Sequence, residues 1–248
     1  TKKVFPLIIL ILIMIFVNIN TSFIPHWIKW NYEGFESKPS WPQYVEINKF
    51  LQGSVQDPRV VYEHSPLHDK FGTERAFESL PLFSGRSTLE GVYMQSSISS
   101  PFIFYIQSEL SEKRSCPFWN NYQCTQINLN KAAQHLEMFN VLHYIVRSDK
   151  IKTEIKNNTN YELLKTIEEY EIYKIKTNSN KYVIPLKKEP ILVELDNFHD
   201  WKKISYEWFT SGDLNTHLVF SKKPDIQFKL TENKESLNTS ILKKVNIE

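Results

Sequence analysis

Glycine is scarce in this sequence, with only six residues among 248, and the motifs that use glycine in nucleotide binding or catalysis are absent. There is no P-loop, no G-x-G-x-x-G fingerprint and no G-x-S-x-G elbow, and the zinc-protease pattern H-E-x-x-H is also missing. The sequence therefore offers weak support for independent catalysis. We predict no catalytic residue and no cofactor in this segment, and leave open whether the protein is an enzyme.

A strong charge of one sign is also lacking. The chain has 30 Lys and Arg against 28 Asp and Glu, and its basic residues are scattered. Because nucleic-acid affinity depends on clustered positive charge, we expect no nucleic-acid partner. Aromatic residues, in contrast, make up 14% of the chain, which is typical of a folded core rather than of a disordered segment.

The N-terminal segment is the longest apolar stretch. Lys2 and Lys3 precede a nearly unbroken apolar run from Val4 to Val17, which as a helix covers about 21 Å, and an extension to Ile24 gives about 31 Å. The aromatic residues typical of a membrane interface follow: Trp27, Trp30 and Tyr32. This pattern predicts a transmembrane helix with its interfacial flank over residues 1–26, with a signal peptide and a buried soluble helix as the alternatives.

Two features predict on which side of the cell membrane the main domain lies. By the positive-inside rule, Lys2 and Lys3 place the start of the chain in the cytoplasm and residues from about 27 onward on the extracytoplasmic side. Cys116 and Cys124 bracket a loop short enough for a disulfide, which an oxidising compartment permits, although two unpaired thiols are the alternative. Since the first residue is Thr1 rather than Met, we expect a longer parent chain.

Hydrophobic spacing predicts an α/β domain, a mixed sheet with flanking helices, over residues 27–212. Residues 213–248 are expected to begin a further β segment or to form a frayed tail. A helix that begins at Thr73 is expected to end at Pro81, and a hairpin is expected to turn near Glu168 and Glu169. The other expected helices are 41–51, 99–111, 128–140, 149–158 and 200–212, and the other expected strands are 59–63, 141–148, 182–186, 190–195, 216–221 and 226–230. Residues 87–94 are expected to be strand or extended.

One short stretch could hold a metal ion. His64 and His68 are four residues apart, and Asp69 follows directly. On a continuous helix the two imidazoles would share a face, as a metal site requires. Pro66 disfavours that helix, so the competing interpretation is a polar loop after a strand.

Residues 85–96 carry an unusual density of polar groups in an otherwise apolar and aromatic region. Buried polar groups cost free energy unless they are hydrogen-bonded, so this density indicates a polar network or an interface. In the first case Arg86 pairs with Glu90 or Glu78 and fixes a loop. In the second, five of these residues contact a substrate or acceptor: Arg86, Glu90, Tyr93, Gln95 and Ser96.

The same region carries a family resemblance. The stretches "GTERAFESLPLFSGRSTLEGVYMQSSISSPF", "HLEMFNVLHYIVRSD" and "YEIYKI" resemble polytopic membrane proteins related to 6-pyruvoyl-tetrahydropterin synthase, over roughly residues 40–200. The G-R-x-T-L-E-G stretch is the most specific part of the resemblance. These proteins in turn resemble multispanning glycosyltransferases that use lipid-linked sugars and carry a soluble domain after their last membrane helix.

The resemblance implies that this chain is the C-terminal extracytoplasmic part of a glycosyltransferase-like protein, with the catalytic residues upstream of Thr1. The domain would then support acceptor or substrate binding. Its partners would be the bilayer, the upstream transmembrane region, and a lipid-linked sugar or glycan acceptor. Pterin chemistry is not implied, because the required three-histidine zinc site and its context are missing. The alternative is a membrane-anchored binding or scaffold module without transfer chemistry.

Overall fold

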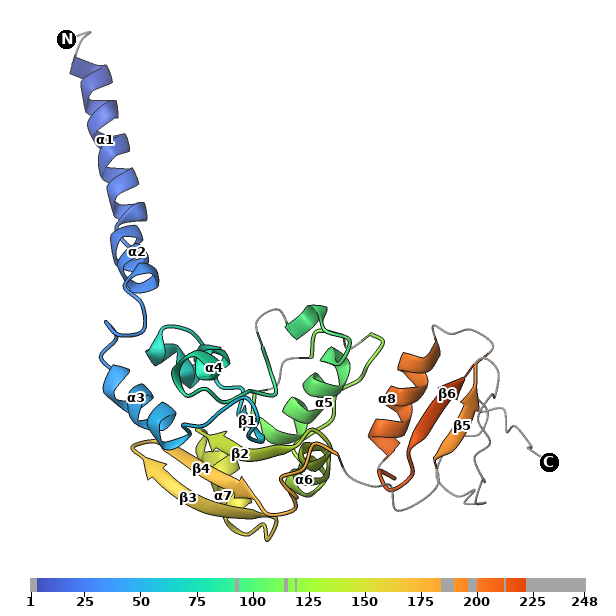
Figure 1. Ribbon diagram of the computed structural model, residues 1–248. Helices are drawn as coiled ribbons and strands as arrows, with labels where there is room; N and C mark the ends of the chain where they lie inside the picture. The colour runs from blue at the N-terminus through green and yellow to red at the C-terminus, as the bar shows by residue number, and fades with distance from the viewer. Residues whose placement is uncertain are drawn as a thin grey trace.

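The computed structural model describes residues 4–91, 94–113, 116–118, 120–183, 190–195, 200–211 and 213–221. These residues form an α/β domain with a four-stranded mixed sheet and flanking helices, preceded by an N-terminal apolar helix (Figure 1). The predicted fold class is confirmed.

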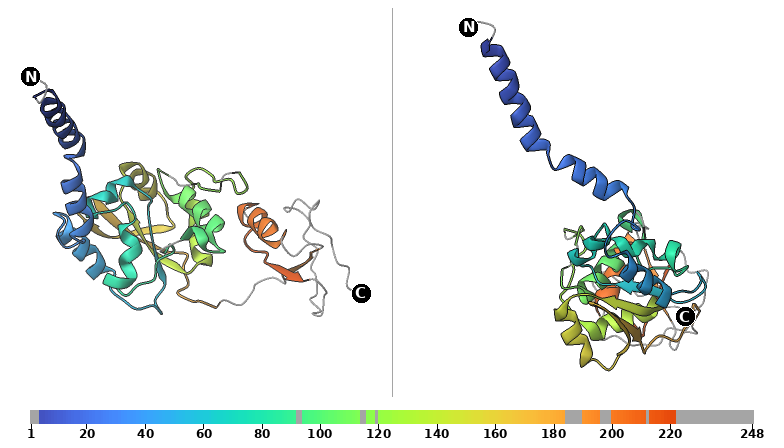
Figure 2. Two further views of the ribbon diagram at one scale, coloured as in Figure 1. Left: turned by 90° about the horizontal axis from the view of Figure 1, so that it is seen from above. Right: turned by 90° about the vertical axis from the view of Figure 1, so that its left-hand side faces the viewer.

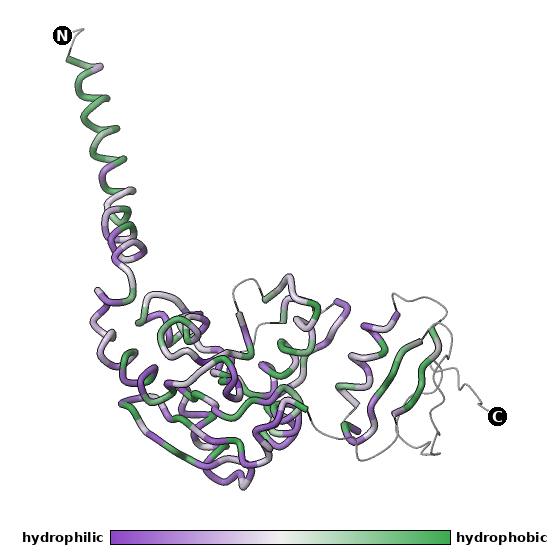
Figure 3. Tube along the Cα trace, viewed as in Figure 1, coloured by the Kyte–Doolittle hydropathy of each residue, from purple (hydrophilic) through white to green (hydrophobic). Residues whose placement is uncertain are grey.

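The N-terminal segment consists of α1 (Val4–Thr21) and α2 (Ile24–Tyr32). Together they form a stretch of 29 residues that is long and apolar enough to cross a membrane. Hydrophobic residues cover most of α1, whereas α2 is mixed (Figure 3). The 18 residues of α1 span about 27 Å, close to the thickness of a hydrocarbon core. The chain bends between the two helices (Figure 2, right).

The central sheet has the order β1-β2-β4-β3. β1 and β2 are parallel, and the other two pairs are antiparallel. The hairpin predicted around Glu168 and Glu169 is confirmed, and Glu168 adopts a positive φ of 48° at its turn. The strands run as follows: β1 (Arg59–Tyr62), β2 (Val141–Val146), β3 (Tyr161–Ile167) and β4 (Tyr170–Ile175).

Helices cover both faces of this sheet. Because side chains alternate along a strand, the neighbours Tyr144 and Ile145 of β2 belong to two different core clusters. The cluster around Tyr144 includes residues of α5 (Ser100–Leu110), α6 (Leu129–Met138) and α7 (Asp149–Lys156). The cluster around Ile145 includes residues of α3 (Trp41–Phe50), of the 3-10 helices η1 (Pro66–Phe71) and η2 (Ala76–Ser79), and of α4 (Leu80–Phe83).

The helix predicted to run from Thr73 to Pro81 is wrong in its boundaries. The segment forms η2 and then α4, and Pro81 lies in the first turn of α4 rather than after its end. The reason is that the first turn of a helix has no use for the amide hydrogen that proline lacks. Residues 87–89 run extended beside β1 through an isolated bridge between Thr88 and Val60, in agreement with the expected strand or extended segment, whereas Met94 begins the 3-10 turn η3 (Met94–Ser96).

A second, two-stranded sheet follows the main domain. The strands β5 (Ile191–Glu194) and β6 (Leu218–Ser221) and the helix α8 (Trp201–Ser211) form where strands and a helix are predicted. The two strands pair in parallel and are connected through α8. Tyr206 and Phe209 of α8 pack into the core cluster of α5 and α6. The strand expected at 226–230 lies outside the described residues, as does most of the one expected at 182–186.

Candidate functional site

The ends of two parallel strands meet at one edge of the main sheet. Glu63 follows β1, and Arg147 and Ser148 follow β2. The main-chain amides of Arg147 and Ser148 both donate to Oε2 of Glu63 at 2.8 Å, so this buried carboxylate fixes the two strand ends. In α/β sheets, ligand sites form outside the carboxyl ends of parallel strands.

A pocket of about 560 Å³ opens beside the end of β1. Its volume falls within the range of about 300–1,000 Å³ that is common for small-ligand sites. Its lining mixes charged and hydrogen-bonding groups with apolar surface: His64, Ser65, Pro66, Glu74, Arg75, Glu90, Met94, Phe104, Lys113 and Pro117. Such a mixture suits a polar ligand that also presents an apolar face.

Glu90 lies in a closed ring of hydrogen bonds at this pocket. Its Oε2 is 2.7 Å from Nε2 of His64, and its Oε1 accepts from Nε2 of Gln107. The hydroxyl of Ser111 donates to Oε1 of Gln107 and accepts from the main-chain amide of His64, both at 2.8 Å. The ring therefore runs from Glu90 through Gln107, Ser111 and His64 back to Glu90. With Glu90 only 2% exposed, these partners offset the cost of burying a carboxylate.

The imidazole of His64 has one nitrogen outside this ring. When a neutral imidazole donates from Nε2, its Nδ1 becomes a hydrogen-bond acceptor. Nδ1 of His64 is buried and has no partner among the groups that the structure describes. Tyr62 adds a hydroxyl 3.4 Å from Oε2 of Glu90, and burial together with the Glu90 charge raises the Tyr62 pKa well above its usual value. The phenol therefore stays protonated as a donor.

A salt bridge borders the pocket. Nε of Arg75 contacts Oε1 of Glu78, and the Arg75 side chain is partly exposed. Burial raises the pKa of Glu78, while its hydrogen bond to Arg75 opposes that rise. The pocket wall thus combines the partly exposed guanidinium of Arg75 with the buried hydrogen-bond ring around the carboxylate of Glu90.

Arg86 lies away from this ring, and its predicted pairing with Glu90 or Glu78 is wrong for the described structure. Its Nε donates to the carbonyl of Pro58 at 3.1 Å, and Nη2 contacts the same carbonyl and Nδ1 of His143. Residues 87–89 run parallel to β1: Val60 donates to the Ser87 carbonyl, and Leu89 donates to the Val60 carbonyl. Arg86 is thereby held at the amino end of β1 and Glu90 at its carboxyl end.

His143 can accept from Arg86 because it is neutral. Burial, followed by the nearby Arg86 charge, lowers the His143 pKa to about 4. Arg86 is itself only 5% exposed. Its contacts therefore fix the segment at residue 86 to the start of β1. Phe104 and Tyr105 of α5 are buried in the same core cluster as Tyr144, and Phe102 packs against it.

The remaining expected contact residues give a mixed result. Tyr93 lies outside the described residues, as does the side chain of Gln95, so both stay predictions. Ser96 is exposed at the end of η3 and is not among the residues that line the pocket. Among the expected contact residues whose side chains the structure describes (Arg86, Glu90 and Ser96), Glu90 is the one that lines the pocket.

The weak metal candidates do not converge. His68 is fully buried, with Nδ1 3.0 Å from the Tyr170 hydroxyl and Nε2 2.7 Å from the Glu63 carbonyl. Burial lowers the His68 pKa to about 4. Asp69 is exposed on η1, and His64 is held by Glu90. Within the described residues, no cluster of three or more His, Cys, Asp or Glu is suited to a metal ion.

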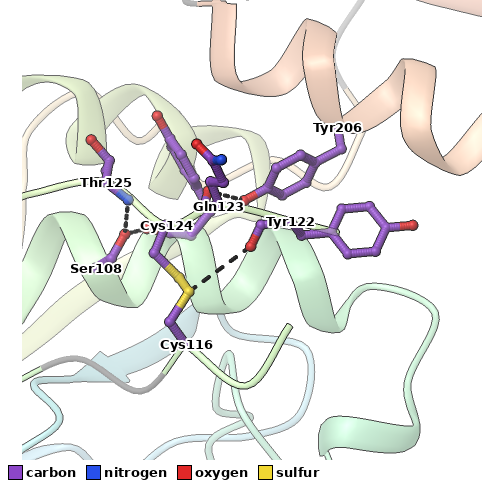
Figure 4. Close-up of a disulfide and its surroundings, with 8 residues drawn as sticks. Ser108, Cys116, Tyr122, Gln123, Cys124, Thr125 and Tyr206 are labelled. Carbon is purple, nitrogen blue, oxygen red and sulfur yellow. Dashed lines mark hydrogen bonds between the residues drawn. A yellow bond between two sulfur atoms is a disulfide. The ribbon is translucent and has the colours of Figure 1, made fainter. Parts of the chain in front are cut away.

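The predicted disulfide between Cys116 and Cys124 is confirmed, with a Cα–Cα distance of 6.1 Å (Figure 4). The loop that it closes contributes Pro117 to the pocket. Ser108 of α5 accepts from the amide of Thr125, and the Tyr206 hydroxyl donates to the Gln123 carbonyl at 2.6 Å (Figure 4). The disulfide loop is therefore fastened to both α5 and α8.

Sequence reasoning missed Gln107, a partner of Glu90, and Ser111, which holds Gln107 in the hydrogen-bond ring. A signal was present, because Gln107 and Ser111 are polar and four positions apart, which places them on one face of the helix and its end. It missed Arg75 and Lys113 in the pocket wall as well, and no sequence pattern distinguishes these two from other scattered basic residues.

Residues 43–191 match a family model described as a domain of unknown function (DUF8559). The matched range contains the four-stranded sheet, the pocket and the disulfide. No curated protein and no solved structure matches the chain.

Proposed function

Since this chain belongs to the DUF8559 family, we propose a function from its own pocket: the α/β domain is a membrane-anchored, extracytoplasmic module that binds a hydroxyl-rich ligand. The observation that supports this most strongly is the buried ring around Glu90 in the wall of a 560 Å³ pocket. A carboxylate and the Nδ1 of His64, which has no partner among the described groups, suit sugar hydroxyls, because a hydroxyl both donates and accepts, and Phe104 offers an apolar face.

The extracytoplasmic side is supported by two features. Disulfides persist mainly in oxidising compartments, and Cys116 and Cys124 are joined. Lys2 and Lys3 precede the apolar helix, as the positive-inside rule expects for a cytoplasmic start. A cysteine introduced at the exposed Ser179 tests this, because both native cysteines are already bonded. A membrane-impermeant maleimide added to intact cells should label it, and labelling only after lysis would overturn the assignment.

We further propose that the domain is the C-terminal part of a multispanning protein. This protein would belong with the polytopic membrane proteins that are labelled as related to 6-pyruvoyl-tetrahydropterin synthase. In this view the domain presents a lipid-linked sugar or glycan acceptor to catalytic residues located upstream. What supports this is the G-R-x-T-L-E-G resemblance, together with a pocket that contains its glutamate, Glu90. An anchored binding module without transfer chemistry is the alternative. Several membrane spans and an acidic loop encoded upstream of Thr1 would favour the first view over the second.

Ligand binding can be tested with the full chain in lipid nanodiscs and a panel of neutral and acidic oligosaccharides. Glu90→Gln should weaken the binding by about tenfold or more, because a hydrogen bond to a charged group is worth about 1.5–3 kcal/mol. Glu154→Gln is the matched control, since Glu154 is exposed on α7 and does not line the pocket. It should bind as the wild type does.

A second variant guards against misfolding of Glu90→Gln. Arg75 lines the pocket and is partly exposed, so Arg75→Gln should leave the fold intact and still weaken binding. If no oligosaccharide binds, or if both pocket variants bind as tightly as Glu154→Gln does, the proposed function is wrong.

A further inference from the structure

Two large apolar side chains are exposed on short elements of the domain. Leu82 of α4 is 79% exposed, and Ile98, between η3 and α5, is 65% exposed. Single exposed apolar residues are normal on soluble proteins, so exposure alone has no meaning here. Their position relative to the N-terminal helices is the informative part.

The N-terminal helices are fastened to the domain next to α4. Nζ of Lys38 donates to the Trp30 carbonyl of α2 and lies 4.1 Å from the centre of the Trp30 ring. Phe35 then packs against Phe83 of α4, with ring centres 5.9 Å apart. Phe83 is the residue directly after Leu82. The end of α2 and the exposed leucine therefore belong to neighbouring parts of one surface.

The views of the whole chain place these elements on one side. α4 and the segment between η3 and α5 lie on the side of the domain from which α1 rises (Figure 1), and the right-hand view of Figure 2 agrees. β3, which carries the exposed Leu163, lies on the opposite side (Figure 1). The surface with Leu82 and Ile98 thus continues from the apolar helix toward the domain.

We propose that this surface, α4 and the turn at 97–99, rests on the same membrane into which α1 inserts. Leu82 and Ile98 then lie at the boundary between headgroups and acyl chains, where apolar side chains on a peripheral surface are stabilised. Continuity with α1 and α2 identifies lipid rather than another protein as the partner.

Depth-dependent fluorescence quenching tests the contact on the full chain. Single cysteines are introduced at Leu82, Ile98 and Leu163, and at Ile13 in α1, and each is labelled with an environment-sensitive nitrobenzoxadiazole dye. The native cysteines are disulfide-bonded, so each introduced thiol is the only reactive one. The chains are reconstituted in phosphatidylcholine vesicles without nitroxide, with lipids that carry a nitroxide near the headgroup, or with lipids that carry it deep in the acyl chain, which reports on position 13.

The dyes at 82 and 98 should lose about half of their emission to the nitroxide lipids, since side chains at this boundary lie within about 10 Å of the acyl chains. The dye at 163 should be unchanged. If the dye at 13 is quenched while those at 82 and 98 respond as 163 does, the proposed contact is wrong, although the anchor is real. A blue shift at 82 and 98 without quenching would identify a protein partner and would also overturn it.

The inference rests on membrane anchoring by α1 and is independent of the pocket ligand. A dye at 13 that the acyl-chain nitroxide leaves unquenched would show that the anchor itself is wrong, and the contact with it. Failure of oligosaccharide binding alone would leave the contact intact. The two proposals can therefore fail separately.

Discussion

Replacing Gln107 with Leu should destabilise the domain strongly, because Gln107 closes the hydrogen-bond ring around Glu90. Gln107 is fully buried in α5. Its amide nitrogen donates to the Tyr62 carbonyl at 3.0 Å and to Oε1 of Glu90, and its amide oxygen accepts from Ser111. Leucine is similar in size, so the substitution removes these bonds without opening a large cavity.

The magnitude follows from the groups that are left behind. Each buried polar group that loses its partner costs about 1–3 kcal/mol, and Glu90 and the Tyr62 carbonyl both lose one. The hydroxyl of Ser111 can rotate, so its loss is smaller. Burying the leucine carbons in place of the amide stabilises the folded state by about 1 kcal/mol. We therefore expect Gln107→Leu to lower the free energy of unfolding by about 1–5 kcal/mol.

Denaturant unfolding of the full chain in detergent, followed by tryptophan fluorescence, measures this change. Gln52→Leu is the matched control, because Gln52 is exposed after α3 and should change the free energy by less than about 0.5 kcal/mol. A second comparison uses Ser111→Ala. Combined with Gln107→Leu, it should cost less than the sum of the two single changes, because both remove the same bond. A loss below about 1 kcal/mol for Gln107→Leu would refute the argument that the ring is a stabilising unit.

Three further outcomes follow from other parts of the domain. Because burial lowers the His68 pKa from 6.5 to about 4, His68 becomes protonated at a lower pH in the folded state than in the unfolded chain. The stability contributed by neutral His68 is present above pH 6.5 and is lost as the pH falls toward 4, by about 1.4 kcal/mol per pH unit. A His68→Asn variant should therefore show a flatter pH dependence of the unfolding free energy. Reducing the bond between Cys116 and Cys124, which are eight positions apart, should lower the unfolding free energy by about 2–3 kcal/mol, and an unchanged melt in reductant would contradict this. Gly85→Ala should destabilise the domain by more than about 1 kcal/mol, because the φ of Gly85 is +74° and a Cβ there would meet a main-chain oxygen at 2.5 Å. Gly91→Ala should have little effect in the same melts, because a Cβ there would meet no described atom within 4 Å beyond its chain neighbours.

The sequence by itself determined the features that depend on local spacing. The apolar run from Val4 predicts α1 from length and composition alone. Leu129, Ala132, Ala133 and Leu136 recur at helical spacing, and α6 buries all four of them. The β3–β4 hairpin and the disulfide join residues close in sequence, so their partners could be identified without knowing the rest of the fold.

Only the tertiary structure decided where the polar residues of the site lie. Arg86 and Glu90 are four positions apart and could pair on a helix, but the segment between them runs extended beside β1 and separates them. The partners of Glu90 instead come from the end of β1 and from α5, through His64 and Gln107. These contacts bring together residues that are far apart in the sequence, and local spacing has no information about which distant chain segment will fill the space beside a buried carboxylate. The packing of α5 against the sheet brings Gln107 to Glu90, and Gln107 donates a hydrogen bond that this buried carboxylate needs in the absence of water.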